Sequence, residues 1–124
     1  MGDLTKNFSW HEFDCKDGTQ VPEEFKENVI VLAENLQIVR DFFQRIITVQ
    51  SAYRHKSYNE SVSGSKKSQH LQAKAADIKI EGFSPSIVFL IMKLMIKNGM
   101  IAAGGLSEYD TFVHYDIRGK FVTW

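Results

Sequence analysis

The sequence of 124 residues contains one cysteine, Cys15, and only two prolines. A single thiol excludes an intramolecular disulfide and a cysteine-rich zinc site. A lone cysteine is more often a small buried apolar group than a nucleophile, so we expect Cys15 to be structural. The longest apolar stretch, from Ile87 to Ile96, is interrupted by Lys93. It is too short to span a bilayer, and no membrane partner is expected.

The chain also lacks net charge, because fifteen basic residues balance fifteen acidic ones. A neutral chain offers no general electrostatic attraction for nucleic acid, so that class of partner is not expected. Residues 1–6 show no apolar run behind a basic start, and no signal peptide is predicted. The hydrophobic content of 44% is sufficient for a core. We expect one domain over residues 1–124, monomeric and made as a soluble cytoplasmic protein.

The apolar residues indicate two amphipathic helices. Pro22 is predicted to open the first, which extends to about residue 44. Ser84 and Pro85 are typical of the start of the second, which ends near Asn98. Side chains spaced three and four residues apart define the apolar face of the first helix. They are Phe25, Val29, Leu32, Leu36, Val39 and Phe43.

Strand patterns fall at residues 46–53, 74–80 and 112–118, with a fourth strand considered at 119–124. Gly104 and Gly105 are interpreted as a turn. The segment between the first two strands is rich in Ser, Gly, Lys and Asn, and we expect it to be a long functional loop. The order of elements predicts an α+β domain in which two main helices pack on a small, mostly antiparallel sheet.

Two histidines and a carboxylate fall where these strands could bring them together. His70 precedes the second strand, and Asp77 lies within that strand. His114 and Asp116 share one face of the third strand, because alternate residues point to the same side. If the apolar faces pack on the helices, the polar faces form one cleft that also holds Arg54 at the end of the first strand. Two histidines and one aspartate are a minimal ligand set for a catalytic zinc ion with one open position.

Ordinary structural roles are the alternative for each of these residues. A single histidine on a strand is usually packed or hydrogen-bonded, and a His-x₆-Asp spacing alone is a weak signal. Arg54 could form a surface salt bridge, and Asp116 could be a strand-edge charge that deters aggregation. A second strand that carries His114 completes a ligand set and therefore favours the zinc site.

Longer motifs surround these residues along the chain. They are Ser51-Ala52-Tyr53-Arg54, Asn59, Ser68-Gln69-His70-Leu71-Gln72-Ala73-Lys74-Ala75-Ala76-Asp77, Tyr109, Phe112-Val113-His114-Tyr115-Asp116, Arg118 and Trp124. In this order they resemble the motifs of the zinc D-Ala-D-Ala carboxypeptidase family, which includes phage peptidoglycan endopeptidases. The likeness is closest to the short, single-domain members. It implies a hedgehog/DD-peptidase-like fold.

The resemblance also implies roles for individual residues. The ligands of one zinc ion would be His70, Asp77 and His114. Arg54 would bind the substrate or stabilise the transition state. Ser68 would orient the His70 loop or bind the peptide, and Tyr53 would be a second substrate-binding residue.

Two positions depart from the family pattern. Ala73 stands where the motif has glycine, which costs roughly 1 kcal/mol if the position needs a positive φ. Thr111 stands where many relatives have a general-base carboxylate, and threonine cannot act as a base. Asp116 is the preferred substitute, because it shares a strand face with the second histidine. Asp110 and Glu108 are the alternatives.

The sequence therefore predicts a zinc peptidase that hydrolyses an amide bond in peptidoglycan peptides, as a carboxypeptidase or an endopeptidase. A phage endolysin that acts on the cell wall after its release fits this reading. The departures at Ala73 and Thr111 motivate an alternative, a non-catalytic zinc-containing module of the same fold that binds cell-wall peptides. A zinc hydrolase for another amide or ester is a third hypothesis.

Overall fold

A four-stranded sheet in the order β1-β2-β4-β3 forms the centre of the fold. Every pairing between these strands is antiparallel. The computed structural model, which describes residues 2–124, therefore confirms the predicted α+β class. The strands are β1 (Ile47–Ser51), β2 (Ala75–Ile80), β3 (Leu106–Glu108) and β4 (Val113–Asp116).

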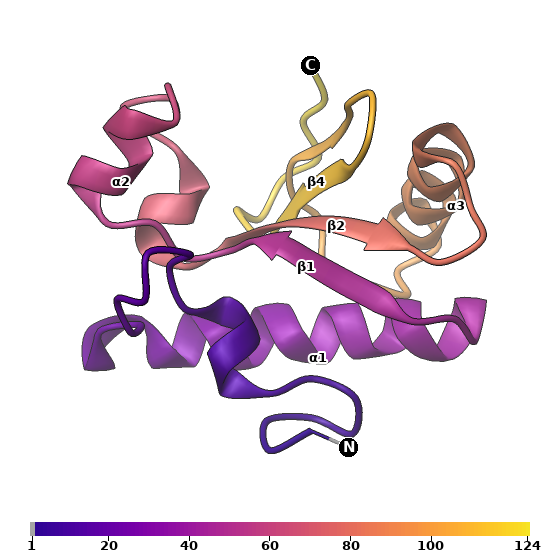
Figure 1. Cartoon of the computed structure of the whole chain (residues 1–124). Coiled ribbons are helices and arrows are strands. Elements are labelled where there is room, and N and C mark those ends of the chain that lie inside the picture. Colours follow the sequence, from indigo (N-terminus) through magenta and orange to yellow (C-terminus); the bar gives the residue numbers. More distant parts are fainter. Residues whose placement is uncertain (1) are drawn as a thin grey trace.

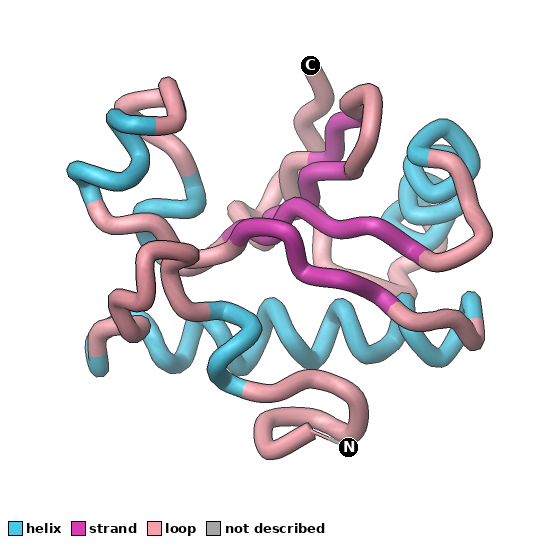
Figure 2. The backbone as a smooth tube through the Cα atoms, viewed as in Figure 1, coloured by secondary structure: helices cyan, strands magenta, loops and turns pink. Residues whose placement is uncertain are grey.

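Three α-helices surround the sheet, and short 3-10 turns lie in the connections. Figure 1 shows α1 running along one side of β1 and β2, with α2 and α3 at opposite ends of these strands. The N-terminal segment, which is mostly loop, lies beside α1 (Figure 2). The helices are α1 (Lys26–Phe43), α2 (Lys56–Ser61) and α3 (Pro85–Lys97). The turns are η1 (Trp10–Phe13), η2 (Glu23–Phe25) and η3 (Gln69–Gln72).

The long helix α1 follows from the apolar spacing of its sequence. Five of the six residues on the expected apolar face are buried in the core, and Phe25 packs against it. The helix begins later than predicted, because Pro22 precedes the single 3-10 turn η2 rather than an α-helical turn. It ends at Phe43, and the following residue, Gln44, caps it in a left-handed conformation at φ 54°. The helix therefore supplies one wall of the core against the sheet.

The sheet places its apolar and polar side chains on different sides, as the alternation in β2 predicts. Ala76, Ile78 and Ile80 are in the core, whereas Asp77 lies between them in sequence and points away. In the β2–β4 ladder Asp77 is directly opposite His114. Side chains of directly opposed residues lie on the same face of a sheet. This register brings the expected ligands of the second and third predicted strands together.

The segment predicted as one long loop, residues 55–69, contains the helix α2. His55 caps this helix, because its Nδ1 accepts a hydrogen bond from the Tyr58 backbone N–H at 3.3 Å. Asn59 is buried and donates to the Ser65 carbonyl at 2.9 Å. Gly64 packs so closely on Asn59 that a Cβ there would lie 2.0 Å from Oδ1. Local hydrogen bonds and close packing of polar side chains therefore order a segment that has no apolar periodicity.

Two expectations for the C-terminal part are wrong. Gly104 and Gly105 do not form a turn but lead into β3, a strand that the sequence reading missed. Residues 119–124 do not form a fourth strand, and only an isolated bridge joins Val122 to Gly105. Across residues 2–124, none of the helices has the length and apolar character needed to cross a bilayer.

Candidate active site

Three side chains meet at the polar face of the sheet. Asp77 comes from β2 and His114 from β4, where the ladder pairs them. His70 comes from η3, the turn that leads into β2. All three are buried, and their ligand atoms lie within 4.8 Å of one another. The structure thus brings together the three residues that the sequence nominates as metal ligands.

The spacing of the three side chains fits a tetrahedral ion. Asp77 Oδ1 lies 3.3 Å from His70 Nε2 and 3.2 Å from His114 Nδ1. Bonds of about 2.0–2.1 Å to a tetrahedral zinc ion place neighbouring ligand atoms about 3.3–3.4 Å apart. The two imidazole rings are inclined at 75° with centroids 5.2 Å apart, so they converge on the carboxylate from different directions.

The outward side of each imidazole ring is held by an acceptor. His70 Nδ1 lies 2.6 Å from the Ala52 carbonyl oxygen, and His114 Nε2 lies 2.8 Å from Asp116 Oδ2. A carbonyl or carboxylate oxygen can only accept, so these two nitrogens carry the ring protons. When an ion is bound, the nitrogens that face Asp77 can therefore present lone pairs to it, which is the tautomer that a metal ion needs. The donor set therefore fits a divalent ion such as zinc.

Charge at the site follows from burial and from these contacts. Burial raises the pKa of the Asp77 carboxyl, but hydrogen bonds with His114 and His70 outweigh it and hold the pKa well below its usual range. Burial lowers the pKa of His114, but hydrogen bonds with Asp116 and Asp77 outweigh it and raise the pKa. The carboxylate of Asp77 is therefore ionised and available as an anionic ligand.

Arg54 lies beside the three residues, at the end of β1. Its guanidinium contacts Asp77 Oδ2 at 3.2 Å and donates to Ser51 Oγ at 3.1 Å and Asn59 Oδ1 at 3.3 Å. These contacts come from β1, β2 and α2, so the guanidinium is held from three elements. The sequence reading noted Ser51 and Asn59 only as parts of motifs and missed that both position Arg54. The sequence signal that could have revealed this role was spacing, because Ser51 lies three residues before Arg54 and Asn59 five residues after it.

Asp116 does not lie where a general base for the cleft would have to be. Its side chain is 0% exposed, and it does not line the cleft. Its two oxygens accept from His114 Nε2 and from the backbone N–H of Gly105 at 2.7 Å, and both contact the Arg118 guanidinium. Burial raises the pKa of Asp116, but these hydrogen bonds outweigh it and lower the pKa. The expectation that Asp116 faces the cleft is therefore corrected: it lies behind His114.

The two glycines before β3 explain why Asp116 can be so enclosed. A Cβ on Gly105 would lie 2.4 Å from Asp116 Oδ2, and one on Gly104 would lie 1.7 Å from the Asp116 carbonyl oxygen. Neither position tolerates a side chain without a shift of the backbone or of the carboxylate. The Gly-Gly pair is therefore a place of close approach, not the turn that was expected.

The other nominated residues have different surroundings. Ser68 caps η3, because its Oγ accepts from the His70 N–H at 3.1 Å, and it also lines the cleft. Tyr53 lies in the core against Phe25 and does not line the cleft, so its placement gives no support to the expected substrate-binding role. Ala73 follows η3 with φ 57°, the left-handed conformation that glycine adopts most readily.

An open cleft of about 600 Å³ lies over these groups. One wall is the loop between α2 and η3, which contributes serines and Lys67. Another part of the lining is aromatic, and sequence reasoning did not assign it a role. Trp124 Nε1 donates to the Tyr109 hydroxyl at 2.8 Å, and the Tyr109 and Phe112 rings stack with centroids 4.6 Å apart. The cleft is lined by Arg54, Val62, Ser63, Gly64, Ser65, Lys67, Ser68, Gln69, His70, Asp77, Tyr109, Phe112, His114, Arg118 and Trp124.

A family model described as Peptidase M15 matches residues 6–116. This span covers the sheet, all three helices and the three converging side chains. No match to a curated protein was found.

Proposed function

Because the chain belongs to the Peptidase M15 family, we propose that it is a zinc-dependent peptidase that hydrolyses an amide bond in the peptides of bacterial peptidoglycan. Family membership supports a peptidase with a peptide substrate. The observation that carries the zinc assignment is the convergence of His70, Asp77 and His114 at the cleft.

The residues that would hold the ion contribute one atom each. They are His70 through Nε2, His114 through Nδ1 and Asp77 through Oδ1. Two imidazoles and a carboxylate are a common protein ligand set for a catalytic zinc ion. When bound, zinc supplies a Lewis acid that polarises a carbonyl group and acidifies water. The acceptors Ala52 and Asp116 keep both rings in the tautomer that this requires.

Arg54 is the proposed substrate-binding and transition-state residue. Its guanidinium lines the cleft beside Asp77 and is already fixed by Ser51 and Asn59. A guanidinium in this position can bind a carboxylate of the peptide or stabilise the developing oxyanion. The neutral acceptors Ser51 and Asn59 orient the guanidinium, and its third partner, Asp77, is shared with the proposed zinc site. Lys67, in the loop between α2 and η3, adds a further positive charge for an anionic peptide.

The placement of Asp116 changes the proposal for the general base. Within residues 2–124, Asp77 is the only carboxylate that lines the cleft. Glu108 accepts a hydrogen bond from Ser86 on α3 at 2.7 Å, so it is turned towards that helix. Asp110 does not line the cleft either, but unlike Asp116 it is exposed, and it follows Tyr109, which lines the cleft. We therefore propose Asp110 as the residue that accepts a proton from water, and Asp116 as a positioning residue for His114.

A pair of matched variants tests this assignment. Asp110→Asn should lower kcat by about 10²-fold, the scale typical of general-base catalysis, and leave the zinc content unchanged. Glu108→Gln, two residues earlier, should keep its activity because its carboxylate faces α3. Equal activity of the two variants would refute the role of Asp110.

The main experiment is a digest of purified peptidoglycan followed by mass spectrometry. The protein should contain stoichiometric zinc and release fragments with new amine ends, and their masses identify the bond that is cut. Removal of zinc by a chelator should abolish the release, and added zinc should restore it. His114→Ala should lose the zinc ion held at the cleft together with its activity, whereas His11→Ala, an exposed histidine of η1, should lose neither.

The alternative of a non-catalytic module predicts a different result. Such a module would contain zinc and bind peptidoglycan without forming new amine ends. If zinc is stoichiometric and several types of cell wall stay intact, the peptidase proposal fails and the binding module is supported.

A further inference from the structure

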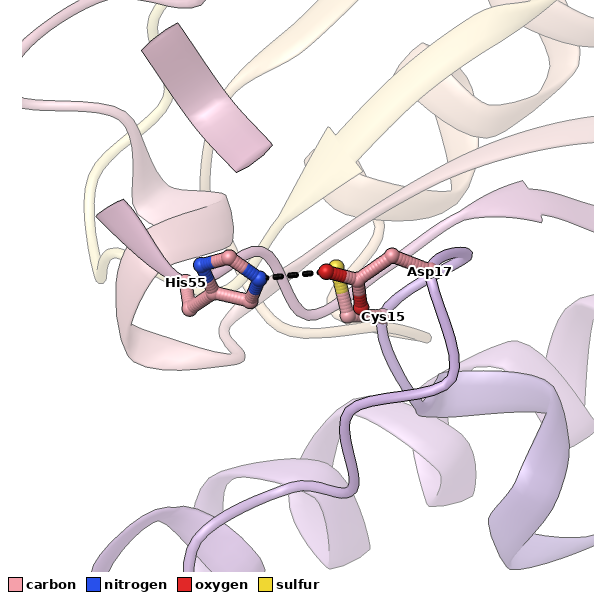
Figure 3. Close-up of side chains that lie close together, drawn as sticks. All are labelled: Cys15, Asp17 and His55. Atoms are coloured by element: carbon pink, nitrogen blue, oxygen red, sulfur yellow. Dashed lines mark hydrogen bonds and ion pairs between the residues drawn. The ribbon is translucent and has the colours of Figure 1, made fainter. Parts of the chain in front are cut away.

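A second group of metal-ligand side chains lies outside the cleft. Cys15, Asp17 and His55 have their ligand atoms within 4.8 Å of one another, and none of the three lines the cleft. Figure 3 shows them close together, with two of them on the N-terminal segment and the third on the segment before α2. Sulfur, carboxylate oxygen and imidazole nitrogen are the three ligand types that zinc takes in proteins.

Two of the three residues, Cys15 and Asp17, lie in a tight loop of the N-terminal segment. The Cys15 N–H donates to the Thr19 carbonyl and the Gly18 N–H donates to the Cys15 carbonyl, each at 2.9 Å. Gly18 has φ +98°, a conformation that a residue with a side chain rarely adopts. The Thr19 N–H donates to Asp17 Oδ1 at 2.9 Å. The loop thereby fixes one carboxylate oxygen of Asp17 and leaves Oδ2 facing His55.

The third residue is His55, which follows Arg54 in the sequence. His55 Nε2 lies 2.5 Å from Asp17 Oδ2. Cys15 is buried, with 3% of the residue exposed, whereas the His55 and Asp17 side chains are 30% and 37% exposed. A soft ligand held in the interior with two ligands at the surface leaves one side open to solvent. This arrangement suits an ion with three protein ligands and one water.

We propose that Cys15 Sγ, Asp17 Oδ2 and His55 Nε2 form a second metal site, which takes zinc or a similar thiophilic divalent ion. Thiolate coordination selects such ions over magnesium or calcium. On binding, the Cys15 thiol gives its proton to solvent. The proton on His55 Nε2 is replaced by one on Nδ1, which ends the hydrogen bond from the Tyr58 N–H. The ion then fastens the loop of residues 15–19 to the start of α2, one residue from Arg54.

This assignment is independent of the proposed peptidase site, and one probe separates the two. Cys15 is the only cysteine in the sequence, so it is the only residue that can supply a thiolate ligand. Co²⁺ bound to a thiolate shows a sulfur-to-metal charge-transfer band in the near ultraviolet, and Co²⁺ bound to histidine and aspartate alone does not. The metal-free protein of 124 residues should therefore take up two equivalents of Co²⁺ and develop the band with one of them. Zn²⁺ should displace both ions and remove the band.

Variants decide whether the band reports this site. His55→Asn keeps a side chain that can cap α2 but removes Nε2, and Asp17→Asn keeps an acceptor for the Thr19 N–H. Both should abolish the band and lower the uptake by one equivalent. The double variant His70→Ala/His114→Ala should lose the other equivalent and keep the band. His11→Ala should change neither quantity.

Three results would overturn the site. The first is uptake of only one equivalent by the wild-type protein, and the second is absence of the band. The third is a band that persists in both His55→Asn and Asp17→Asn, because it would show that the thiol binds the ion without the other two residues. His55 and Asp17 lie at the surface, so these variants keep the test decisive even if Cys15→Ser does not fold.

Discussion

The carboxylate of Asp116 holds the ring of His114 from behind. Its Oδ2 lies 2.8 Å from Nε2, while the opposite ring nitrogen, Nδ1, lies 3.2 Å from Asp77 Oδ1. The ring is thus clamped between two carboxylates that serve different purposes. One is a proposed ligand at the cleft, and the other decides which nitrogen carries the proton.

Asp116→Asn should weaken zinc binding by about 10–100-fold, the usual effect of removing the acceptor behind a ligating histidine. Oδ1 accepts from the backbone N–H groups of Gly105 and Arg118, so the amide oxygen of asparagine should take that place. The amide NH₂ group then points at His114 Nε2 and forces the proton onto Nδ1. A competition titration against a chromophoric chelator measures the affinity. Asp41→Asn, an exposed change on α1, is the control, and an unchanged affinity of Asp116→Asn would refute the clamp.

The sequence could predict that the side chains of Asp77 and His114 converge, because side chains alternate between the two faces along a strand, and this is a local rule. Asp77 interrupts an apolar alternation in β2, and His114 occupies the corresponding polar position in β4. Both had to project from the side opposite the core. The left-handed φ at Ala73 and the capping by Ser68 also agree with what the motif implies.

The complete burial of Asp116 behind His114 could not be predicted in this way. Alternation placed it on the same face as His114, but its enclosure depends on Gly104 and Gly105 approaching from β3. β3 has three residues, which is too short for a periodic signal. The helix α2 was missed for a related reason, because its order comes from the buried Asn59 and not from an apolar face. Both errors concern contacts that leave no periodic pattern of apolar residues in the sequence.

Gly105→Ala should destabilise the fold by about 1–3 kcal/mol, the usual cost of overpacking a buried position. The new Cβ would lie 2.4 Å from Asp116 Oδ2 and 2.8 Å from Arg118 Nη2, so the ion pair behind His114 must move. Urea denaturation of the metal-free protein measures the loss in the free energy of unfolding. The same variant should bind zinc more weakly. A variant with wild-type stability and wild-type zinc affinity would contradict the close approach.

Arg54→Lys should lower kcat/KM by about 10²–10³-fold, the range seen when one donor to a developing oxyanion is removed. Lysine keeps the positive charge beside Asp77, so zinc content should stay stoichiometric. It cannot reproduce the fixed planar fork that Ser51, Asn59 and Asp77 hold. The peptidoglycan digest gives the rate, and elemental analysis gives the zinc. Arg45→Lys, exposed just after α1, is the matched control. Full activity of Arg54→Lys would exclude a role that depends on the guanidinium geometry.

Tyr115 should make the protein lose stability in alkaline solution. Its side chain is buried in the core, and its hydroxyl donates to the Ala102 carbonyl oxygen at 2.7 Å. Burial raises the pKa of the phenol, and the charge of Asp116 raises it further. In the unfolded chain the phenol ionises near its ordinary pKa of about 10. The folded state therefore binds more protons than the unfolded state above that pH.

The contribution of Tyr115 is fully present below pH ~10 and is lost as the pH rises from there towards the raised pKa of the folded protein. The free energy of unfolding should fall by up to about 1.4 kcal/mol per pH unit for this one proton. Tyr115→Phe should be less stable at neutral pH by about 1 kcal/mol, because the Ala102 carbonyl loses its donor. It should also show a shallower decline above pH ~10. Urea denaturation between neutral and strongly alkaline pH measures both slopes. Parallel curves for the two proteins would mean that Tyr115 does not govern the alkaline loss of stability.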